Sequence, residues 1–202
     1  MDADAWDERY AASELVWSAE PNQFVAQECA DLPPGRAVDL AAGEGRNAIW
    51  LARRGWQVTA VDFSAVALDK GARLAGDTAV EWVVGDATRW RSEAPVDLAV
   101  IAYLQLPAAA RRAASRNAVE SLRRGGTFLL VAHDSTNLAE GTGGPQDPAV
   151  LMTAEDVLAD LDGFDVDVVR AGRVAREVVA GDDHRGAESA TAWDCLVRLT
   201  RR

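Results

Sequence analysis

Short apolar runs alternate with helical patterns along most of the chain, and no internal repeat interrupts them. This alternation constrains the fold most, because strands that alternate with helices build a parallel sheet covered by helices. Strands are predicted at about 37–42, 57–62, 80–84, 96–103 and 127–132. Helices are predicted at about 46–54, 64–74 and 107–124, the second capped by Ser64 and the third closed by Gly125 and Gly126.

The pattern changes after residue 133. Residues 134–152 are rich in Gly, Pro and Asp, which predicts a long loop of the kind that is usually functional. A short helix at 154–161 precedes two strands, about 164–178 and 191–199, which can pair as an antiparallel hairpin. We therefore expect an α/β fold: a Rossmann-like, mostly parallel seven-stranded sheet with helices on both faces and a C-terminal antiparallel β-hairpin.

Charge and composition restrict the partners. The 202 residues include 21 Lys and Arg against 32 Asp and Glu, a formal charge of −11 that repels phosphate backbones, so a small-molecule partner is expected and a nucleic acid is not. Apolar runs are too short to cross a bilayer, and the first four residues include two Asp and no Lys or Arg, so we expect a cytoplasmic protein without a membrane partner. Cys29 and Cys195 lack metal-ligand spacing, so no metal site is expected.

The turn after the first strand carries the strongest chemical signal. Gly43-x-Gly45-x-x-Ala48 allows a sharp turn into a helix whose first N–H groups are free to hold a ligand. Asp62, at the end of the second strand, is placed to bind ribose hydroxyls. By itself this pattern also satisfies the fingerprint for dinucleotides, so a nicotinamide-dependent oxidoreductase is one reading.

Asp39 favours a different cofactor. It lies inside an otherwise apolar strand, where an unpartnered carboxylate is costly, so it should meet a cationic or hydrogen-bonding group of a ligand. A carboxylate at this position repels a pyrophosphate and attracts an amino group. The expected cofactor therefore has an amino-acid end, a ribose and an adenine, as S-adenosylmethionine does.

Five motifs in order, over roughly residues 36–133, resemble the class I S-adenosylmethionine-dependent methyltransferases. They are Asp39-Leu40-Ala41-Ala42-Gly43-Glu44-Gly45, Val61-Asp62-Phe63-Ser64, Val84-Gly85-Asp86-Ala87, Val96-Asp97-Leu98-Ala99-Val100-Ile101 and Arg124-Gly125-Gly126-Thr127-Phe128. The resemblance implies that Asp39 and the Gly43 turn hold the methionine part and that Asp62 holds the ribose. It also implies Phe63 on the adenine face, with Asp86 and the Ala87 backbone at the adenine edge.

The full expected cofactor-binding set adds neighbours of these motifs. It consists of Tyr10, Asp39, Ala41, Gly43, Gly45, Arg46, Asp62, Phe63, Ser64, Asp86, Ala87 and Ala102. Arg46 could pair with the methionine carboxylate or with Glu44 on the surface, and both readings stay open. The departure from the family pattern is Ala41, where the family usually has glycine.

Three further segments resemble the tellurite-resistance branch, which is related to the thiopurine S-methyltransferases. They are Trp6-Asp7-Glu8-Arg9-Tyr10, Gly45-Arg46-Asn47-Ala48 and His184-Arg185. This resemblance implies that the N-terminal aromatic segment covers the cofactor and that His184 and Arg185 line the substrate pocket as catalytic residues. It also implies a soft methyl acceptor, such as a thiol, selenium or tellurium species.

Residues 1–202 are expected to form a single methyltransferase domain, as a monomer or homodimer. Within it, 1–35 would be a helical cap, 36–133 the cofactor-binding core and 134–202 the substrate side. The alternative function that is not enzymatic is that of an S-adenosylmethionine-binding module without catalysis. His133, Tyr103 and Gln105 lie near the expected acceptor position and can be read as pocket residues or as structural ones.

Overall fold

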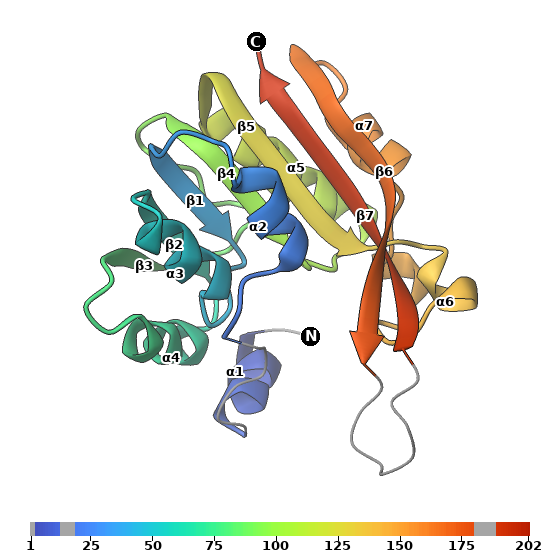
Figure 1. The fold of residues 1–202 in the computed structure, drawn as a ribbon, viewed down its shortest axis with the longest axis horizontal. Helices are drawn as coiled ribbons and strands as arrows, with labels where there is room; N and C mark the ends of the chain where they lie inside the picture. The colour runs from blue at the N-terminus through green and yellow to red at the C-terminus, as the bar shows by residue number, and fades with distance from the viewer. Residues whose placement is uncertain (1–2, 13–18, 180–188) are drawn as a thin grey trace.

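The computed structural model describes residues 3–12, 19–179 and 189–202, which form a seven-stranded sheet of order β3-β2-β1-β4-β5-β7-β6 (Figure 1). The strands are β1 (Arg36–Leu40), β2 (Gln57–Asp62), β3 (Val80–Val84), β4 (Val96–Ala102), β5 (Leu122–His133), β6 (Val166–Val179) and β7 (Ser189–Arg201). The helices are α1 (Ala3–Ala11), α2 (Gln23–Cys29), α3 (Arg46–Arg53), α4 (Ala65–Ala75), α5 (Ala108–Ser121), α6 (Asn137–Glu140) and α7 (Ala154–Asp160), with a 3-10 turn, η1, at Pro148–Val150.

Strands β1 to β5 are parallel, and β7 pairs antiparallel with both β5 and β6. The expected mostly parallel sheet with a C-terminal antiparallel hairpin is thus confirmed. The pairing of β5 with β7 ends at His133 and Asp194, but β6 and β7 continue together to Val179 and Ser189. The hairpin therefore extends past the end of β5, as Figure 1 shows.

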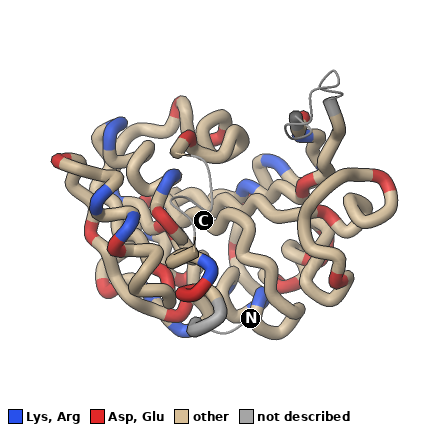
Figure 2. Tube along the Cα trace, turned by 90° about the horizontal axis from the view of Figure 1, so that it is seen from below, with Lys and Arg blue, Asp and Glu red and all other residues tan. Residues whose placement is uncertain are grey.

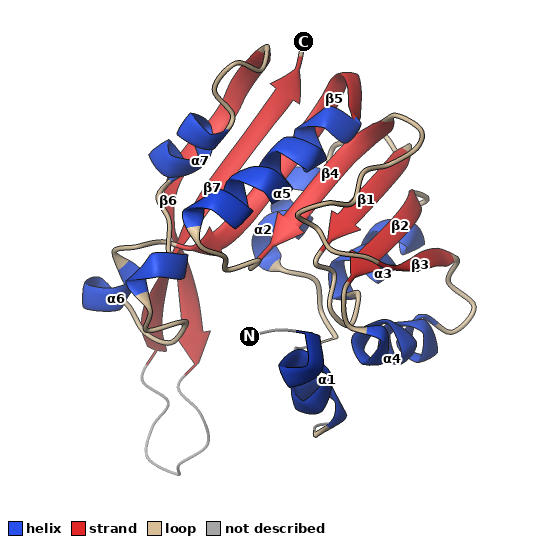
Figure 3. Ribbon diagram, turned by 180° about the vertical axis from the view of Figure 1, so that it is seen from behind, coloured by secondary structure: helices blue, strands red, loops and turns tan. Residues whose placement is uncertain are grey.

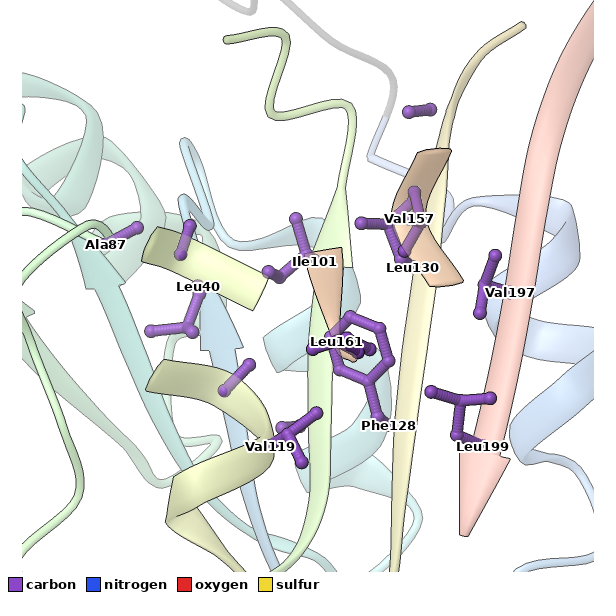
Figure 4. Packing of buried hydrophobic residues seen from close by; sticks show 14 of the residues in the cluster. Leu40, Ala87, Ile101, Val119, Phe128, Leu130, Val157, Leu161, Val197 and Leu199 are labelled. Atoms are coloured by element: carbon purple, nitrogen blue, oxygen red, sulfur yellow. The ribbon is translucent and has the colours of Figure 1, made fainter. Parts of the chain in front are cut away.

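Each face of the sheet is covered by its own hydrophobic cluster, because side chains alternate along a strand. On one face Val38, Leu40 and Phe128 pack with the helices α5 and α7 (Figures 3 and 4). On the other face Ala37 and Leu98 belong to a cluster that includes α2 and α3. Asp39 stands between Val38 and Leu40, so its side chain lies on the α3 face.

The boundary between α5 and β5 differs most clearly from the sequence prediction. Helix α5 ends at Ser121 and β5 begins at Leu122, although the helix was expected to continue to Gly125. The reason is pairing with β4: Val96 pairs with Leu122 and Leu98 with Thr127, and the intervening residues are accommodated as an irregularity in the strand.

The segment 134–152 is also more ordered than the predicted loop, since it contains α6 and η1. Asn137 organises it: its amide donates to Gly143 O at 2.9 Å, and its side-chain oxygen accepts from Trp193 N on β7 at 2.7 Å. The first bond closes a local turn, whereas the second joins residues that are far apart in the chain, which local sequence patterns do not show. The bond from Trp193 holds the segment against the hairpin.

Among the described residues, no helix is both long and apolar enough to span a membrane. Lys and Arg segments are interspersed with Asp and Glu segments in the view of Figure 2. The formal net charge of the chain is −11.

Candidate functional site

The carboxyl ends of the parallel strands meet at one edge of the sheet, where ligands bind in open α/β sheets. The residues after β1, β2, β3 and β4 all lie at this edge. Helix α1 lies below it on one side and α6 with the hairpin on the other (Figures 1 and 3). The expected cofactor-binding residues are therefore brought to the same part of the molecule.

Asp39 is the most unusual group at this edge. Its side chain is 1% exposed, and neither carboxylate oxygen has a hydrogen-bond partner among the described residues. Burial raises the pKa of Asp39 to about 7, a rise that the nearby Ala48 amide and the Arg46 guanidinium only partly offset. A buried, unsatisfied carboxylate is costly to the free protein, so it fits a ligand that supplies a cationic donor.

The backbone of the turn after β1 is strained. Ala41 has a φ of +57°, a conformation that costs a residue with a Cβ roughly 1–2 kcal/mol. This explains physically why glycine is usual there in the family that the sequence resembles. Gly45 has a φ of +74°, and a Cβ on it would lie 2.4 Å from the ring of Trp82, so glycine is required at this position.

Asp62 joins the turn to the end of β2. Its carboxylate accepts hydrogen bonds from Gly43 N at 2.8 Å and Ser64 N at 2.9 Å. Burial raises its pKa, and the charge of Asp7 on α1 adds to the rise, while these backbone bonds oppose it. Ser64 caps α4 as expected, because its hydroxyl accepts from Ala67 N and donates to Asp7.

A small pocket opens beside this turn. Its lining is mostly apolar and consists of Ala41, Phe63, Gly85, Asp86, Ala87, Thr88, Leu104 and Leu106. Asp86 lies at the rim, where one carboxylate oxygen accepts from the amide and the hydroxyl of Thr88 at 2.8 and 2.7 Å. An apolar slot with one acceptor at its edge suits a flat heteroaromatic ring.

Helix α1 packs against this edge through Tyr10, which is only 5% exposed. The Lys70 ammonium donates to Tyr10 O at 2.8 Å and forms an ion pair with Glu44 at 2.8 Å. Glu44 belongs to the turn after β1, so Lys70 connects the turn, α4 and α1. The N-terminal aromatic segment is thereby held close to the expected cofactor residues.

A second polar cluster lies where β4 and β5 meet the hairpin. The Tyr103 hydroxyl and Arg176 Nε both donate to Oδ2 of Asp194 at 2.7 Å. His133 Nδ1 lies 3.3 Å from Oδ1 of the same carboxylate, and the rings of Tyr103 and His133 are 4.8 Å apart. Tyr103 also accepts from the Asn22 amide at 3.3 Å and has a φ of +59°.

The electrostatics of this cluster keep Asp194 ionised. Burial would raise the pKa of Asp194, but the adjacent His133 and the hydrogen bonds from Arg176 and Tyr103 together hold it below its usual range. Burial and the adjacent Asp194 charge raise the pKa of Tyr103, so its hydroxyl stays a proton donor. The pKa of Arg176 is raised, since burial is outweighed by its bond to Asp194.

Arg46 links the two parts of the site. It is partly buried, and burial lowers its pKa, while the neighbouring Tyr103 and Asp39 raise it.

Ala102 is the last residue of β4, directly before Tyr103. Gln105 has a structural role, because it accepts from His133 N at 2.9 Å and donates to Val150 O at 2.8 Å.

Sequence reasoning missed Asp194 and Arg176. Asp194 is a charged residue inside the apolar run of β7, which is the same signal that marked Asp39 in β1. Arg176 is one of many Arg in the sequence, and nothing local distinguishes it. His184 and Arg185, the two expected catalytic residues, lie outside the described residues.

Comparison with known proteins relates part of the chain to a known family. Residues 37–126 match the family described as "Methyltransferase domain". A demethylmenaquinone methyltransferase of Clavibacter sepedonicus is 40% identical over 77 residues, which are 38% of this chain and 30% of that protein. The chain spans no more than 30% of the length of the curated relatives it matches.

Solved structures resemble the whole chain. A structure from work on converting a disulfide bond into a thioacetal group during echinomycin biosynthesis has a TM-score of 0.76 and 18% identity, covering 98% of this chain and 91% of that one. The N-methyltransferase NodS from Bradyrhizobium japonicum WM9, solved with S-adenosyl-L-homocysteine, has a TM-score of 0.73 and 17% identity, with 99% of each chain covered. The chain thus shares the Rossmann-like fold of these solved structures, and its residues 37–126 match the methyltransferase domain family.

Proposed function

We propose that this protein transfers a methyl group from S-adenosylmethionine to a small-molecule acceptor. The observation that carries the proposal is the buried carboxylate of Asp39, whose two oxygens have no partner among the described residues. The amino group of the cofactor would supply the missing donor and the compensating charge. A pyrophosphate would instead add negative charge beside a buried carboxylate, so a dinucleotide fits less well.

The other residues fit the remaining parts of the cofactor. Asp62 would hold the ribose hydroxyls, and the pocket lined by Phe63, Asp86 and Ala87 would hold the adenine. Arg46 would pair with the methionine carboxylate. Helix α1, held at Tyr10 by Lys70, would cover the bound cofactor and keep water away from it.

The cofactor supplies a reactive methyl sulfonium, so the protein needs mainly to align the acceptor and exclude water. We propose a soft acceptor, such as a thiol, selenium or tellurium species, as in the tellurite-resistance branch that the sequence resembles. Arg185 would hold an anionic group of the acceptor, and His184 would orient the acceptor or take its proton. We also propose that residues 1–202 act as one domain in the cytoplasm, as a monomer or homodimer without nucleic acid or membrane partners.

The experiment that tests the proposal combines binding with turnover. Calorimetric titration should show binding of S-adenosylmethionine and no comparable binding of NAD. Release of S-adenosylhomocysteine is then followed over a panel of thiols, selenite, tellurite, phenols and amines. Binding of the cofactor without release for any acceptor would favour a non-catalytic binding module, and preferential binding of NAD would refute the proposal.

Variants of the two residues outside the described part separate the acceptor side from the cofactor side. His184→Ala should lower turnover, and Arg185→Ala should raise the KM for anionic acceptors while leaving neutral thiols nearly unchanged. Both variants should bind S-adenosylmethionine within a few-fold of wild type. Unchanged turnover and KM in both variants would show that neither His184 nor Arg185 takes part in acceptor binding or methyl transfer.

A further inference from the structure

We infer that His133, oriented by Asp194, takes the proton from a thiol acceptor during methyl transfer. The inference rests on the proposed function and adds to it a residue and an acceptor class. The polar cluster between β4, β5 and the hairpin supports it.

The two oxygens of Asp194 have different partners. Oδ2 accepts from both Tyr103 and Arg176 at 2.7 Å. Oδ1 is left facing His133 Nδ1 at 3.3 Å, and neither of these two atoms makes a hydrogen bond within the described part of the chain. The two atoms form a close polar contact that is not yet aligned as a hydrogen bond, which is common for catalytic pairs before a ligand is bound.

This pairing sets the role of each ring nitrogen. A carboxylate beside Nδ1 favours the proton on Nδ1, which leaves the lone pair of a neutral imidazole on Nε2. Asp194 is fully buried and its pKa is held below its usual range, so its charge is present to stabilise an imidazolium. Such an arrangement makes Nε2 a proton acceptor.

The ring of His133 is held in place on its other sides. Tyr103 packs against it with the ring centroids 4.8 Å apart. Gly144, in the segment 134–152, lies so close that a Cβ added to it would be 3.0 Å from His133 Nδ1. Such fixed placement is what a proton-accepting group needs, since a general base must keep its geometry toward the reacting atom.

The cluster also adjoins the cofactor residues. Tyr103 follows β4 directly, and β4 pairs with β1, the strand of Asp39. Arg46 interacts electrostatically with both Tyr103 and Asp39. His133 therefore lies on the same edge as the cofactor residues, on the side nearest the hairpin.

In the proposed step, Nε2 of His133 accepts the proton that the thiol loses as its sulfur forms a bond to the methyl carbon. The bond that breaks joins that carbon to the sulfonium sulfur, which keeps the electron pair. Asp194 offsets the positive charge on the imidazolium without changing its own protonation, so it is a positioning residue.

The first test determines which ring nitrogen of His133 carries the proton, from the nitrogen-15 chemical shifts of the imidazole. The spectra are recorded in alkaline buffer with S-adenosylhomocysteine added. The chain has two His, so His133→Asn and His184→Asn assign the signals. We expect the proton on Nδ1 of His133 in wild type and loss of this preference in Asp194→Asn. Tyr103→Phe should keep it, since that variant leaves the Asp194 carboxylate beside the ring.

Asp167→Asn is the matched control, because Asp167 is a hairpin carboxylate paired with Arg202 on the exposed part of β6. It should leave the His133 signals unchanged. A proton on Nε2 in the wild-type protein would overturn the inference, whatever the activity of the variants.

The second test compares two thiols in His133→Asn. An aliphatic thiol must lose its proton during transfer, whereas an acidic aromatic thiol is already a thiolate at neutral pH. Turnover of the aliphatic thiol should fall about 10²–10⁴-fold, and that of the aromatic thiolate should stay near wild type. Equal losses for both would indicate a packing role and overturn the inference, as would the same selective loss in His184→Asn alone.

The outcomes separate this inference from the proposed function. Failure of wild-type protein to bind S-adenosylhomocysteine would refute the proposed function itself. Cofactor binding and methylation of phenols or amines, with neither thiol methylated, would overturn the thiol inference and leave the methyltransferase proposal standing.

Discussion

Binding of S-adenosylhomocysteine should release protons from Asp39. In the free protein burial raises the pKa of this carboxyl to about 7, so at pH 7 it is protonated in about half of the molecules. The amino group of the ligand favours the carboxylate and lowers this pKa. We therefore expect release of about 0.5 proton per ligand at pH 7, about 0.1 at pH 8 and close to one at pH 6.

The same pKa predicts the pH dependence of stability in the ligand-free protein. Because the folded pKa lies above the unfolded value of 3.8, the native state binds more protons between these two values, and the free energy of unfolding falls as pH rises through them. The total loss from this group is about 4 kcal/mol between acidic pH and pH above 7. Asp39→Asn should remove this part of the pH dependence.

Calorimetry measures the proton release directly. Titrations with S-adenosylhomocysteine at pH 7 in phosphate and in Tris, which differ in ionisation enthalpy, give the number of protons from the difference in observed heat. Asp39→Asn should bind more weakly and release fewer protons. Asp62→Asn serves as the comparison, because burial also raises the pKa of Asp62. Identical proton release in wild type and Asp39→Asn would refute the assignment of Asp39 to the amino group.

Three further predictions concern single positions. Asp62→Ala should weaken S-adenosylhomocysteine binding by well over tenfold, since each charge-assisted bond to the ribose contributes roughly 1.5–3 kcal/mol; unchanged affinity by calorimetry would contradict the ribose assignment. Asp160→Ala should cost about 3–5 kcal/mol in urea unfolding, because it leaves the buried Arg111 guanidinium, now 2.6 Å from its carboxylate, without that partner; a loss below 1 kcal/mol would contradict this. Ala41→Gly should be more stable than the matched Ala42→Gly by about 1–2 kcal/mol, because only position 41 has a positive φ; equal unfolding free energies would show that Ala41 is not strained.

The sequence alone predicted the order of most elements of the sheet and the residues proposed for the cofactor side of the site. Strand–helix alternation is a local pattern, so β1 to β4 and α3 and α4 could be placed from it. Asp39 could be singled out because a charge inside an apolar strand needs a partner wherever the strand lies. Asp62 ends a strand and Phe63 follows it, and parallel strands bring their carboxyl ends to one edge.

Only the tertiary structure brought together the residues of the proposed acceptor side. Four different strands or strand ends contribute its residues, Tyr103, His133, Arg176 and Asp194. The antiparallel register of β7 sets His133 opposite Asp194. A shift of that register by one residue would turn Asp194 to the other face of the sheet. The end of α5 at Ser121 was likewise decided by pairing of β5 with β4, which local stop signals at Gly125 and Gly126 do not reveal. Long-range pairing thus fixed the part of the site that local patterns could not.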